Sequence, residues 1–395
     1  MRRSILLSLS IVGLMVAPVL SHASTVTVPD DFPTLQAVMD TVSYGTIDTV
    51  IVRQGVLTDS LVGYNLPGLM VIGLGDSLSR PSIGPMVLNT HLEPPVTFVN
   101  FRFTGSIHNV AKSNLAFRDC RLEAGLSTII NGDPRTLSLV GCRITGRVIA
   151  QSDIGVTVLG CWFDRGTVML LTDGILRVEN STFTGSGTGI SDYTAIYASG
   201  DVSAVIRGNT IRGVGAAIDV YATSGGPFQI HGNVVEHCGT GISAGGRIQL
   251  TDNVVTDCAG DGIRVLDQDD NSHIIEGNVI ARSGGHGVFV QVNGSIIIRH
   301  NTSFANTSSG YAFQLDELAG ENQVTHNIAY RNGHHGLVSF GSLDPQLSCN
   351  DWFGNDSSAV AGMDPSRSTH CSVTSTTTAS AWPRIRRCSM RRAAG

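Results

Sequence analysis

An asparagine recurs at a nearly constant spacing through the second half of the chain and constrains its fold more than any other feature. Each copy lies beside a short run rich in β-branched residues, and successive copies are 20 to 26 residues apart. Repeats of this length indicate stacked supersecondary units, because a single unit is too small to bury its own apolar face. The six asparagines are Asn209, Asn233, Asn253, Asn278, Asn301 and Asn327.

Each repeat also carries a glycine turn of the form Gly-x-Gly-apolar. Clear copies are Gly239–Ile242, Gly260–Ile263 and Gly285–Val288. Between the two markers the residues alternate at period two, which is typical of strands rather than helices. The pattern predicts a parallel β-solenoid whose inward asparagine amides form hydrogen bonds from one rung to the next.

These repeats resemble the right-handed parallel β-helix repeat proteins of the pectin-lyase-like superfamily, and the resemblance covers nearly all of the mature chain. It implies an all-β fold, a right-handed parallel β-helix of about a dozen three-strand coils with an N-terminal amphipathic capping helix. The segment from Pro29 to Ala37 and the strand-like run from Asp48 to Val52 resemble the entry segment of its secreted members. The superfamily holds lyases, hydrolases, epimerases and adhesins, so the resemblance implies a fold rather than one activity.

The two ends of the chain differ from the repeat region. Residues 1–23 carry two arginines, an apolar stretch and a small-residue cleavage motif, which predict a signal peptide and a secreted or cell-surface protein. We expect residues 24–365 to form the parallel β-helix domain, with residues 24–48 as its N-terminal cap. Residues 366–395 form an atypical Ser/Thr/Arg-rich tail without periodicity, which predicts disorder or a shifted reading frame. Helical spacing within the cap is formed by Leu35, Val38, Met39 and Val42.

The charge of the chain argues against one class of partner. Its net charge of −6 includes Arg2, Arg3 and six arginines beyond Ser366. Without these eight, the stretch from Ser24 to Ser366 has 18 basic and 32 acidic side chains, a net charge of −14. A nucleic-acid groove needs clustered positive charge, so nucleic acid is not an expected partner. The apolar leader is short and contains Pro18, which disfavours a transmembrane anchor. No membrane insertion is therefore expected after signal cleavage. We expect the protein to be a monomer.

Cysteines take the place of asparagine in the earlier repeats. Cys120, Cys142 and Cys161 are expected to point inward and to pack as small hydrophobic side chains. Zinc is not expected there, because the column has no Cys-x-x-Cys pair and no adjacent histidine. Cys238 and Cys258 occupy equivalent positions on neighbouring coils, and a disulfide between them stays open as an alternative.

Outward columns of residues form the binding faces of a solenoid. Aligning the glycine turns predicts two such columns. One is formed by the variable residue x of the Gly-x-Gly-apolar turn. The other is formed by the outward residue after the apolar one, and it begins with Asp219 and Ser243. Asp, Arg, His and Tyr within a few rungs can supply acid, base, charge and an apolar surface for a sugar. We therefore predict a carbohydrate-binding site, with an ordinary solvated polar face as the alternative interpretation. The predicted site residues are Asp261, Arg264, His286, Phe289, Tyr311 and Gln314.

An inserted loop adds a candidate metal site. Asp267, Asp269 and Asp270 bring carboxylates close together, as Ca²⁺ binding requires, although the remaining positions of a calcium-hand loop are missing. The alternative is a charged surface insertion between two strands. No other cofactor is expected to be required.

The favoured function is binding of an extracellular glycan, with processing of that glycan as an open extension. A neutral glycan is favoured, because an acidic body repels a polyuronate unless Ca²⁺ bridges the two. Two alternatives stay open: a structural or adhesive surface protein without catalysis, and a polysaccharide lyase or hydrolase. Gly284–Gly287 superficially resembles the polygalacturonase pattern, but the carboxylate required one coil earlier is missing. A lysine base is also hard to place, because the single lysine, Lys112, lies many coils from the candidate face.

Overall fold

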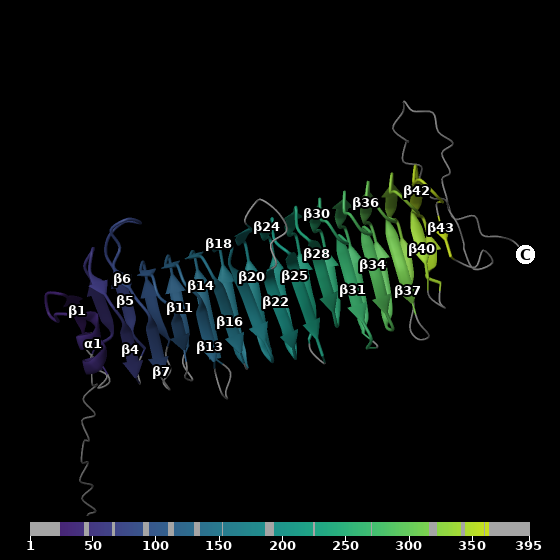
Figure 1. The fold of residues 1–395 in the computed structure, drawn as a ribbon. Helices are drawn as coiled ribbons and strands as arrows, with labels where there is room; N and C mark the ends of the chain where they lie inside the picture. The colour runs from purple at the N-terminus through teal and green to yellow at the C-terminus, as the bar shows by residue number, and fades with distance from the viewer. Residues whose placement is uncertain are drawn as a thin grey trace, which may run out of the picture.

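In the computed structural model the chain is an elongated stack of coils with the N-terminal cap at one end (Figure 1). The predicted signal peptide and the tail from residue 366 lie outside the described residues. No described helix is long and apolar enough to span a membrane. The structure describes residues 24–42, 47–64, 68–89, 95–109, 114–129, 135–151, 153–185, 193–223, 226–269, 271–315, 322–340, 344–358 and 360–362.

Each regular coil contributes one strand to each of three parallel sheets, which we name A, B and C. The chain passes from sheet A to sheet B to sheet C and returns to sheet A one rung further on. The predicted all-β parallel solenoid is therefore confirmed. Within the described residues, sheet A has 15 strands and sheets B and C have 14 each.

Sheet A consists of β1 (Thr25–Val28), β2 (Thr49–Val52), β5 (Met70–Gly73), β8 (Val96–Val99), β11 (Leu115–Arg118), β14 (Arg135–Val140), β17 (Ile154–Leu159), β20 (Gly174–Glu179), β23 (Val202–Arg207), β26 (Phe228–His231), β29 (Ile248–Thr251), β32 (Ser272–Glu276), β35 (Ser295–Arg299), β38 (Gln323–Thr325) and β41 (Gln346–Ser348). Sheet B consists of β3 (Leu57–Thr58), β6 (Ser82–Ile83), β9 (Arg102–Phe103), β12 (Arg121–Leu122), β15 (Arg143–Ile144), β18 (Trp162–Asp164), β21 (Thr182–Thr184), β24 (Thr210–Arg212), β27 (Val234–Glu236), β30 (Val254–Thr256), β33 (Val279–Ala281), β36 (Thr302–Phe304), β39 (Ile328–Tyr330) and β42 (Asp351–Phe353). Sheet C consists of β4 (Leu61–Tyr64), β7 (Met86–Asn89), β10 (Ile107–Asn109), β13 (Leu126–Ile129), β16 (Arg147–Gln151), β19 (Thr167–Leu171), β22 (Thr194–Gly200), β25 (Ala216–Ala222), β28 (Thr240–Gly245), β31 (Ile263–Asp267), β34 (Val288–Val292), β37 (Tyr311–Leu315), β40 (Leu337–Ser339) and β43 (Val360–Ala361).

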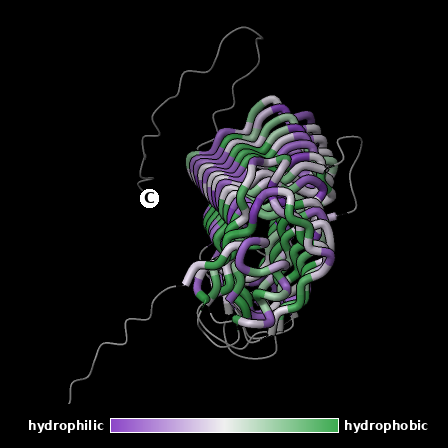
Figure 2. The backbone as a smooth tube through the Cα atoms, turned by 90° about the vertical axis from the view of Figure 1, so that its left-hand side faces the viewer, coloured by the Kyte–Doolittle hydropathy of each residue, from purple (hydrophilic) through white to green (hydrophobic). Residues whose placement is uncertain are grey.

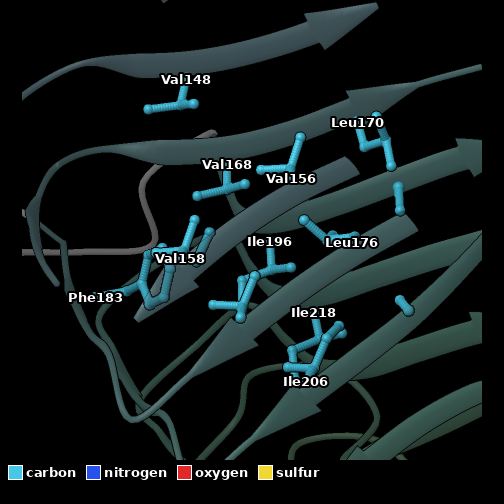
Figure 3. Packing of buried hydrophobic residues seen from close by; sticks show 14 of the residues in the cluster. Val148, Val156, Val158, Val168, Leu170, Leu176, Phe183, Ile196, Ile206 and Ile218 are labelled. Atoms are coloured by element: carbon cyan, nitrogen blue, oxygen red, sulfur yellow. The ribbon is translucent and has the colours of Figure 1, made fainter. Parts of the chain in front are cut away.

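The core is a continuous apolar column enclosed by the three sheets. Side chains alternate along each strand, so inward residues of successive rungs stack on one another, as they do around Val158 and Leu176 (Figure 3). Aromatic rings stack in the same way, with the rings of Phe163 and Phe183 4.4 Å apart and nearly parallel. Seen end-on, residues of like hydropathy line up in stripes along the stack (Figure 2). The core therefore grows by one layer with every coil.

The turn from sheet A to sheet B holds the predicted asparagine ladder. The residue before each asparagine has a positive φ, as at Gly208 (64°) and Asp252 (54°), which directs the next side chain inward. The amide Nδ2 of Asn253 donates to Oδ1 of Asn278 at 2.9 Å and to the carbonyl of Ile230 at 2.9 Å. The ladder is confirmed and runs one rung further than predicted, through Asn209, Asn233, Asn253, Asn278, Asn301, Asn327 and Asn350.

The inward cysteines occupy the same column earlier in the stack. The backbone N–H of Cys142 donates to Sγ of Cys161 at 3.4 Å, and the Cys142 thiol donates to the carbonyl of Phe117 at 3.4 Å. Burial raises the pKa of the Cys120 thiol well above its usual value, so this thiol keeps its proton. These cysteines are buried, as expected. Cys238 and Cys258 are buried free thiols, so the disulfide left open between them is not formed.

A second ladder, which the sequence reasoning missed, lies at the turn from sheet B to sheet C. The amide of Asn306 donates to Oδ1 of Asn332, and that of Asn332 to Oδ1 of Asn355, each at 2.9 Å. The backbone N–H of Ser283 donates to Oδ1 of Asn306 at 2.9 Å, which extends the column by one rung. These asparagines are 26 and 23 residues apart in the sequence. The spacing argument that predicted the first ladder would therefore have predicted this one as well.

The N-terminal cap has the predicted amphipathic helix, α1 (Leu35–Val42). Its four periodic apolar residues are all buried. Oγ1 of Thr34 accepts a hydrogen bond from the N–H of Ala37 at 3.1 Å, as an N-cap residue does. The side chain of Gln36 accepts from the N–H of Val62 and donates to its carbonyl, both at 2.8 Å. The helix therefore satisfies backbone groups of β4, at the first edge of sheet C.

The asparagine ladder generates a stability prediction. In Asn253→Asp a carboxylate replaces an amide whose two N–H bonds join neighbouring rungs. Both acceptors lose that side-chain donor, and the carboxylate comes to lie against Oδ1 of Asn278, which keeps only the backbone N–H of residue 253. We expect the free energy of unfolding to fall by about 2–4 kcal/mol, measured by denaturant titration. Asn293→Asp is the matched control: its amide makes one solvent-exposed bond, to the carbonyl of Gln268, so its free energy of unfolding should stay within about 1 kcal/mol of the parent's. A ladder variant as stable as this control would contradict the structural role of the ladder.

Candidate functional site

Five outward residues of consecutive sheet-C strands stand in register and form what we call the sheet-C row. They come from β22, β25, β28, β31 and β34, where side chains of opposite parity point into the core. Ser243 is 6% exposed, Arg264 is exposed and the other three are half-buried. The row is Tyr197, Asp219, Ser243, Arg264 and Phe289.

Tyr221 joins this row from the next outward position of β25. Its hydroxyl forms a short hydrogen bond with Oγ of Ser243 on the neighbouring strand. The ring reaches that strand across Gly245, where an added Cβ would lie 2.7 Å from Cδ1 of Tyr221. Glycine at this position therefore makes room for the tyrosine to lie over the sheet and contact the row.

The charge on Asp219 is set by its surroundings. Burial raises the pKa of its carboxyl, while hydrogen bonds from Tyr221 and Ser243 and the charge of Arg264 act in the opposite direction. Burial also raises the pKa of Tyr221, whose hydroxyl stays protonated at neutral pH. The result is a compact group of hydroxyl donors around one carboxyl of raised pKa, beside an exposed guanidinium.

Phe289 lies between two cationic or polar groups. Cζ of Arg264 lies over its ring, 5.7 Å from the centroid, and the imidazole of His286 lies 5.9 Å away at an angle of 31°. Arg264, Phe289 and His286 are therefore brought together as the sequence predicted. Both neighbours therefore cover part of the ring of Phe289. Tyr197 and Tyr221 provide further aromatic surface at the opposite end of the row.

Asp261 and His286 belong to a further ladder at the entrance to sheet C. Oδ1 of Asp261 accepts from the backbone N–H of His286 at 2.7 Å, and Nδ1 of His286 accepts from the N–H of Ser309 at 3.3 Å. The N–H of His335 donates to Oγ of Ser309 at 3.4 Å. Burial lowers the pKa of His286. Its Nδ1 serves as an acceptor, so the neutral ring carries its proton on Nε2. These side chains hold the turns as well as lining the candidate face.

Tyr311 is not on this face, and its predicted outward position is wrong. It pairs with Val288 rather than with His286, and it is fully buried, with its ring 5.4 Å from that of Trp352. Gln314 is half-exposed but pairs with Gln291, so it lies in the next outward column and not in the sheet-C row.

Of the three aspartates of the inserted loop, Asp267 and Asp269 lie within the described residues, and these two form no cation cage with their described neighbours. Asp267 is 7% exposed, and its carboxylate accepts from the N–H of Asp269 at 3.1 Å and from Nδ2 of Asn271 at 2.9 Å. Nε2 of the buried His273 lies 3.2 Å from the same carboxylate. Burial raises the pKa of Asp267, but these three partners outweigh it and lower the pKa. Asp270 lies outside the described residues.

Among the residues that the structure describes, no group of three or more His, Cys, Asp or Glu side chains could hold a metal ion. Asp267 instead organises the loop that leads from sheet C to sheet A, since its oxygens are occupied by groups of that loop and of β32. This assignment favours the charged surface insertion over the candidate Ca²⁺ site.

A depression of about 230 Å³ lies on a different face, over sheet A. Part of its polar lining is already paired: Arg207 donates to Glu179, outside the lining, at 3.0 Å, and Nδ1 of His231 lies 2.9 Å from Oγ1 of Thr251. The sheet-C row combines a half-buried acid, hydroxyls, an exposed cation and aromatic rings, so we take it as the candidate site. Tyr197 and Tyr221 were missed from the sequence, although each alternates with inward apolar residues, in β22 and in β25.

The comparisons with known proteins bear on the fold. The family model described as right handed beta helix region matches residues 148–280 and 216–378. A comparison with curated proteins found no match. Similar solved structures include the catalytic domain of a GH87 α-1,3-glucanase in complex with tetrasaccharides, with 13% identity over 89% of this chain and 68% of that one and a TM-score of 0.43.

Two epimerases are also similar. The A-module of the Azotobacter vinelandii mannuronan C-5 epimerase AlgE4 has 14% identity over 88% of this chain and 98% of its own, with a TM-score of 0.38. The periplasmic alginate epimerase AlgG has 12% identity over 78% and 76%, with a TM-score of 0.36. The two family matches together span more than half of the sequence, and the three parallel sheets have the corresponding architecture; the chain belongs to the right-handed β-helix family.

Proposed function

We propose that the sheet-C row binds a neutral extracellular glycan that lies along the stack of coils. The observation that carries the proposal is the register of five outward residues of complementary chemistry on five consecutive strands. Neighbouring strands are about 4.8 Å apart, so the row presents a line of donors, acceptors and rings. A linear oligosaccharide has hydroxyls and apolar ring faces along its length, which such a line can contact.

The chemistry of the row suits hydroxyl groups better than charged ones. Ser243 and Tyr221 can each donate or accept, Asp219 accepts when ionised, and Arg264 supplies several donors. The half-exposed rings of Tyr197 and Tyr221 offer apolar faces for stacking against a sugar ring. The acidic repeat region disfavours a polyuronate at this face, which supports a neutral ligand.

Processing of the glycan is a second candidate, supported by one specific observation. A carboxyl whose pKa is raised by burial keeps its proton to a higher pH than an exposed one, which favours a role as a general acid; burial raises the pKa of Asp219 beside Tyr221 and Ser243. The predicted signal peptide at residues 1–23 supports action outside the cytoplasm. An assay for new reducing ends released from a neutral glycan by the purified protein distinguishes processing from binding alone, and an assay for unsaturated uronates released from a polyuronate tests the lyase alternative.

Substitutions in the row test the binding proposal. We expect Arg264→Ala to weaken the affinity for a neutral oligosaccharide identified by glycan-array screening by about tenfold, since an interfacial arginine is a frequent source of binding energy. Arg299→Ala, at an exposed position of sheet A, should bind like the parent. If both variants retain the affinity of the parent in calorimetric titration, the sheet-C row is not the binding site.

Asp219→Asn separates binding from stability. Because the folded-state pKa of Asp219 is raised, its stabilising contribution is greatest at acid pH and is lost as the pH rises through that value. The amide variant should therefore lose glycan affinity, while its free energy of unfolding at pH 7 equals or exceeds that of the parent. A parallel loss of stability in denaturant titrations would indicate a structural role instead.

Chelation tests the remaining role of Ca²⁺. Since the carboxylate of Asp267 is engaged by its own loop, glycan affinity should be the same in the presence of EDTA and of added Ca²⁺. A marked loss of affinity in EDTA that Ca²⁺ restores would reinstate the loop as a metal site.

A further inference from the structure

A row of three arginines crosses the outer face of sheet B in the first half of the solenoid. Arg102, Arg121 and Arg143 pair in register on β9, β12 and β15, and Trp162 continues the same column on β18. All four side chains are exposed, with Trp162 at 51%. Register places the arginines about 4.8 Å apart, closer than the repulsion between like charges would favour in the absence of a counter-anion. We call these three residues the arginine row.

Nearby carboxylates neutralise this cluster only in part. Glu123 accepts from Arg102 at 3.0 Å and from Arg121 at 2.7 Å, so one carboxylate serves two guanidinium groups. Arg143 and Arg165 approach Asp164 only at 3.9 and 3.7 Å. Among these described side chains four cations face two anions, which leaves a local excess of positive charge on a repeat region whose net charge is −14.

Trp162 adds a flat apolar surface at the end of the row. Cζ of Arg143 lies 5.9 Å from the centroid of its ring, and the next residue of the column is the much shorter Thr182. A half-exposed tryptophan beside a small residue leaves ring surface for a planar or cyclic ligand group. The column thus combines evenly spaced cations with one stacking position.

We propose that the arginine row and Trp162 form a second ligand site, which binds an acidic polysaccharide strand running along the solenoid axis. Guanidinium groups pair with carboxylate or sulfate oxygens in a planar, two-point geometry, which suits arginine rather than lysine. One cation per strand fits a polymer that carries its anions at regular intervals, and Trp162 stacks on a sugar ring.

The rest of the molecule determines which polyanion fits. The acidic body repels the densely charged backbone of a nucleic acid wherever that backbone extends beyond the short row. A glycan with more widely spaced charges avoids most of this repulsion. Because the row lies on sheet B and the sheet-C row lies on another face, the proposal is independent of the proposed function. A chain with both sites would hold two glycan segments at once.

The test compares charge-matched variants of the full chain. Arg121→Gln/Arg143→Gln removes two charges from the row, and Arg282→Gln/Arg299→Gln removes two exposed arginines that pair with other carboxylates. The probes are a hyaluronan hexasaccharide, hexagalacturonate, neutral maltohexaose, oligothymidylate and vesicles of phosphatidylglycerol. Affinities are measured at low and at physiological salt, and melting temperatures establish that each variant is folded.

We expect at least one acidic hexasaccharide to bind the parent in a salt-dependent manner. The row variant should lose at least about tenfold in affinity, while the control variant stays within about twofold. Arg143→Gln alone leaves both bonds to Glu123 intact and should show a smaller loss in the same direction, as should Trp162→Ala. The proposal is overturned if no acidic hexasaccharide binds, or if both double variants lose affinity equally. Tighter binding of oligothymidylate or of vesicles through the same arginines would also overturn it.

Discussion

Hydrogen bonding from one coil to the next is the interaction on which the rest of this structure depends. Within the sheets the backbone groups of each strand pair with the equivalent strand of the neighbouring coil. At the corners the backbone bends out of the ladder pattern, and its inward N–H groups would be buried without partners. The asparagine amides fill this need, because each donates and accepts along the stack. Asn253, for example, accepts from Asn233 and donates to Asn278.

Different side chains can satisfy the backbone groups at a corner, provided that they accept a hydrogen bond. In the A-to-B column the residue changes from cysteine through Ser181 to asparagine, and the N–H of Cys161 donates to Oγ of Ser181 at 3.1 Å. At the entrance to sheet C the acceptors are Asp261, His286 and Ser309. Residue types that usually signal catalysis therefore serve the backbone here. In a solenoid, a polar column needs a second observation before it counts as a functional site.

Register also decides which outward residues meet. Residues more than 20 positions apart become neighbours about 4.8 Å apart, and this brings Tyr221 to Ser243 and Arg121 to Arg143. Local charge can consequently differ in sign from the charge of the whole chain. The net charge of −14 for the repeat region predicts repulsion of polyanions, yet sheet B carries a row of arginines that the overall composition conceals.

The sequence alone determined the fold class, the capping helix and the first asparagine ladder, because period-two alternation and a constant repeat length leave few other ways to bury the apolar face. It also predicted the proximity of Arg264, Phe289 and His286. Only the tertiary structure decided the register between coils of unequal length. Aligning the glycine turns matches Gly310 to Gly285 and places Tyr311 in a turn. In the structure Gly310 lies opposite Gly287, two residues further on. Tyr311 therefore lies opposite Val288, in the inward row of β37. Gln314 stays outward after the same shift, because side chains alternate with a period of two. The loops between strands vary in length, so the pairing of backbone groups across coils, rather than the spacing of turn residues, determines which side chains share a face.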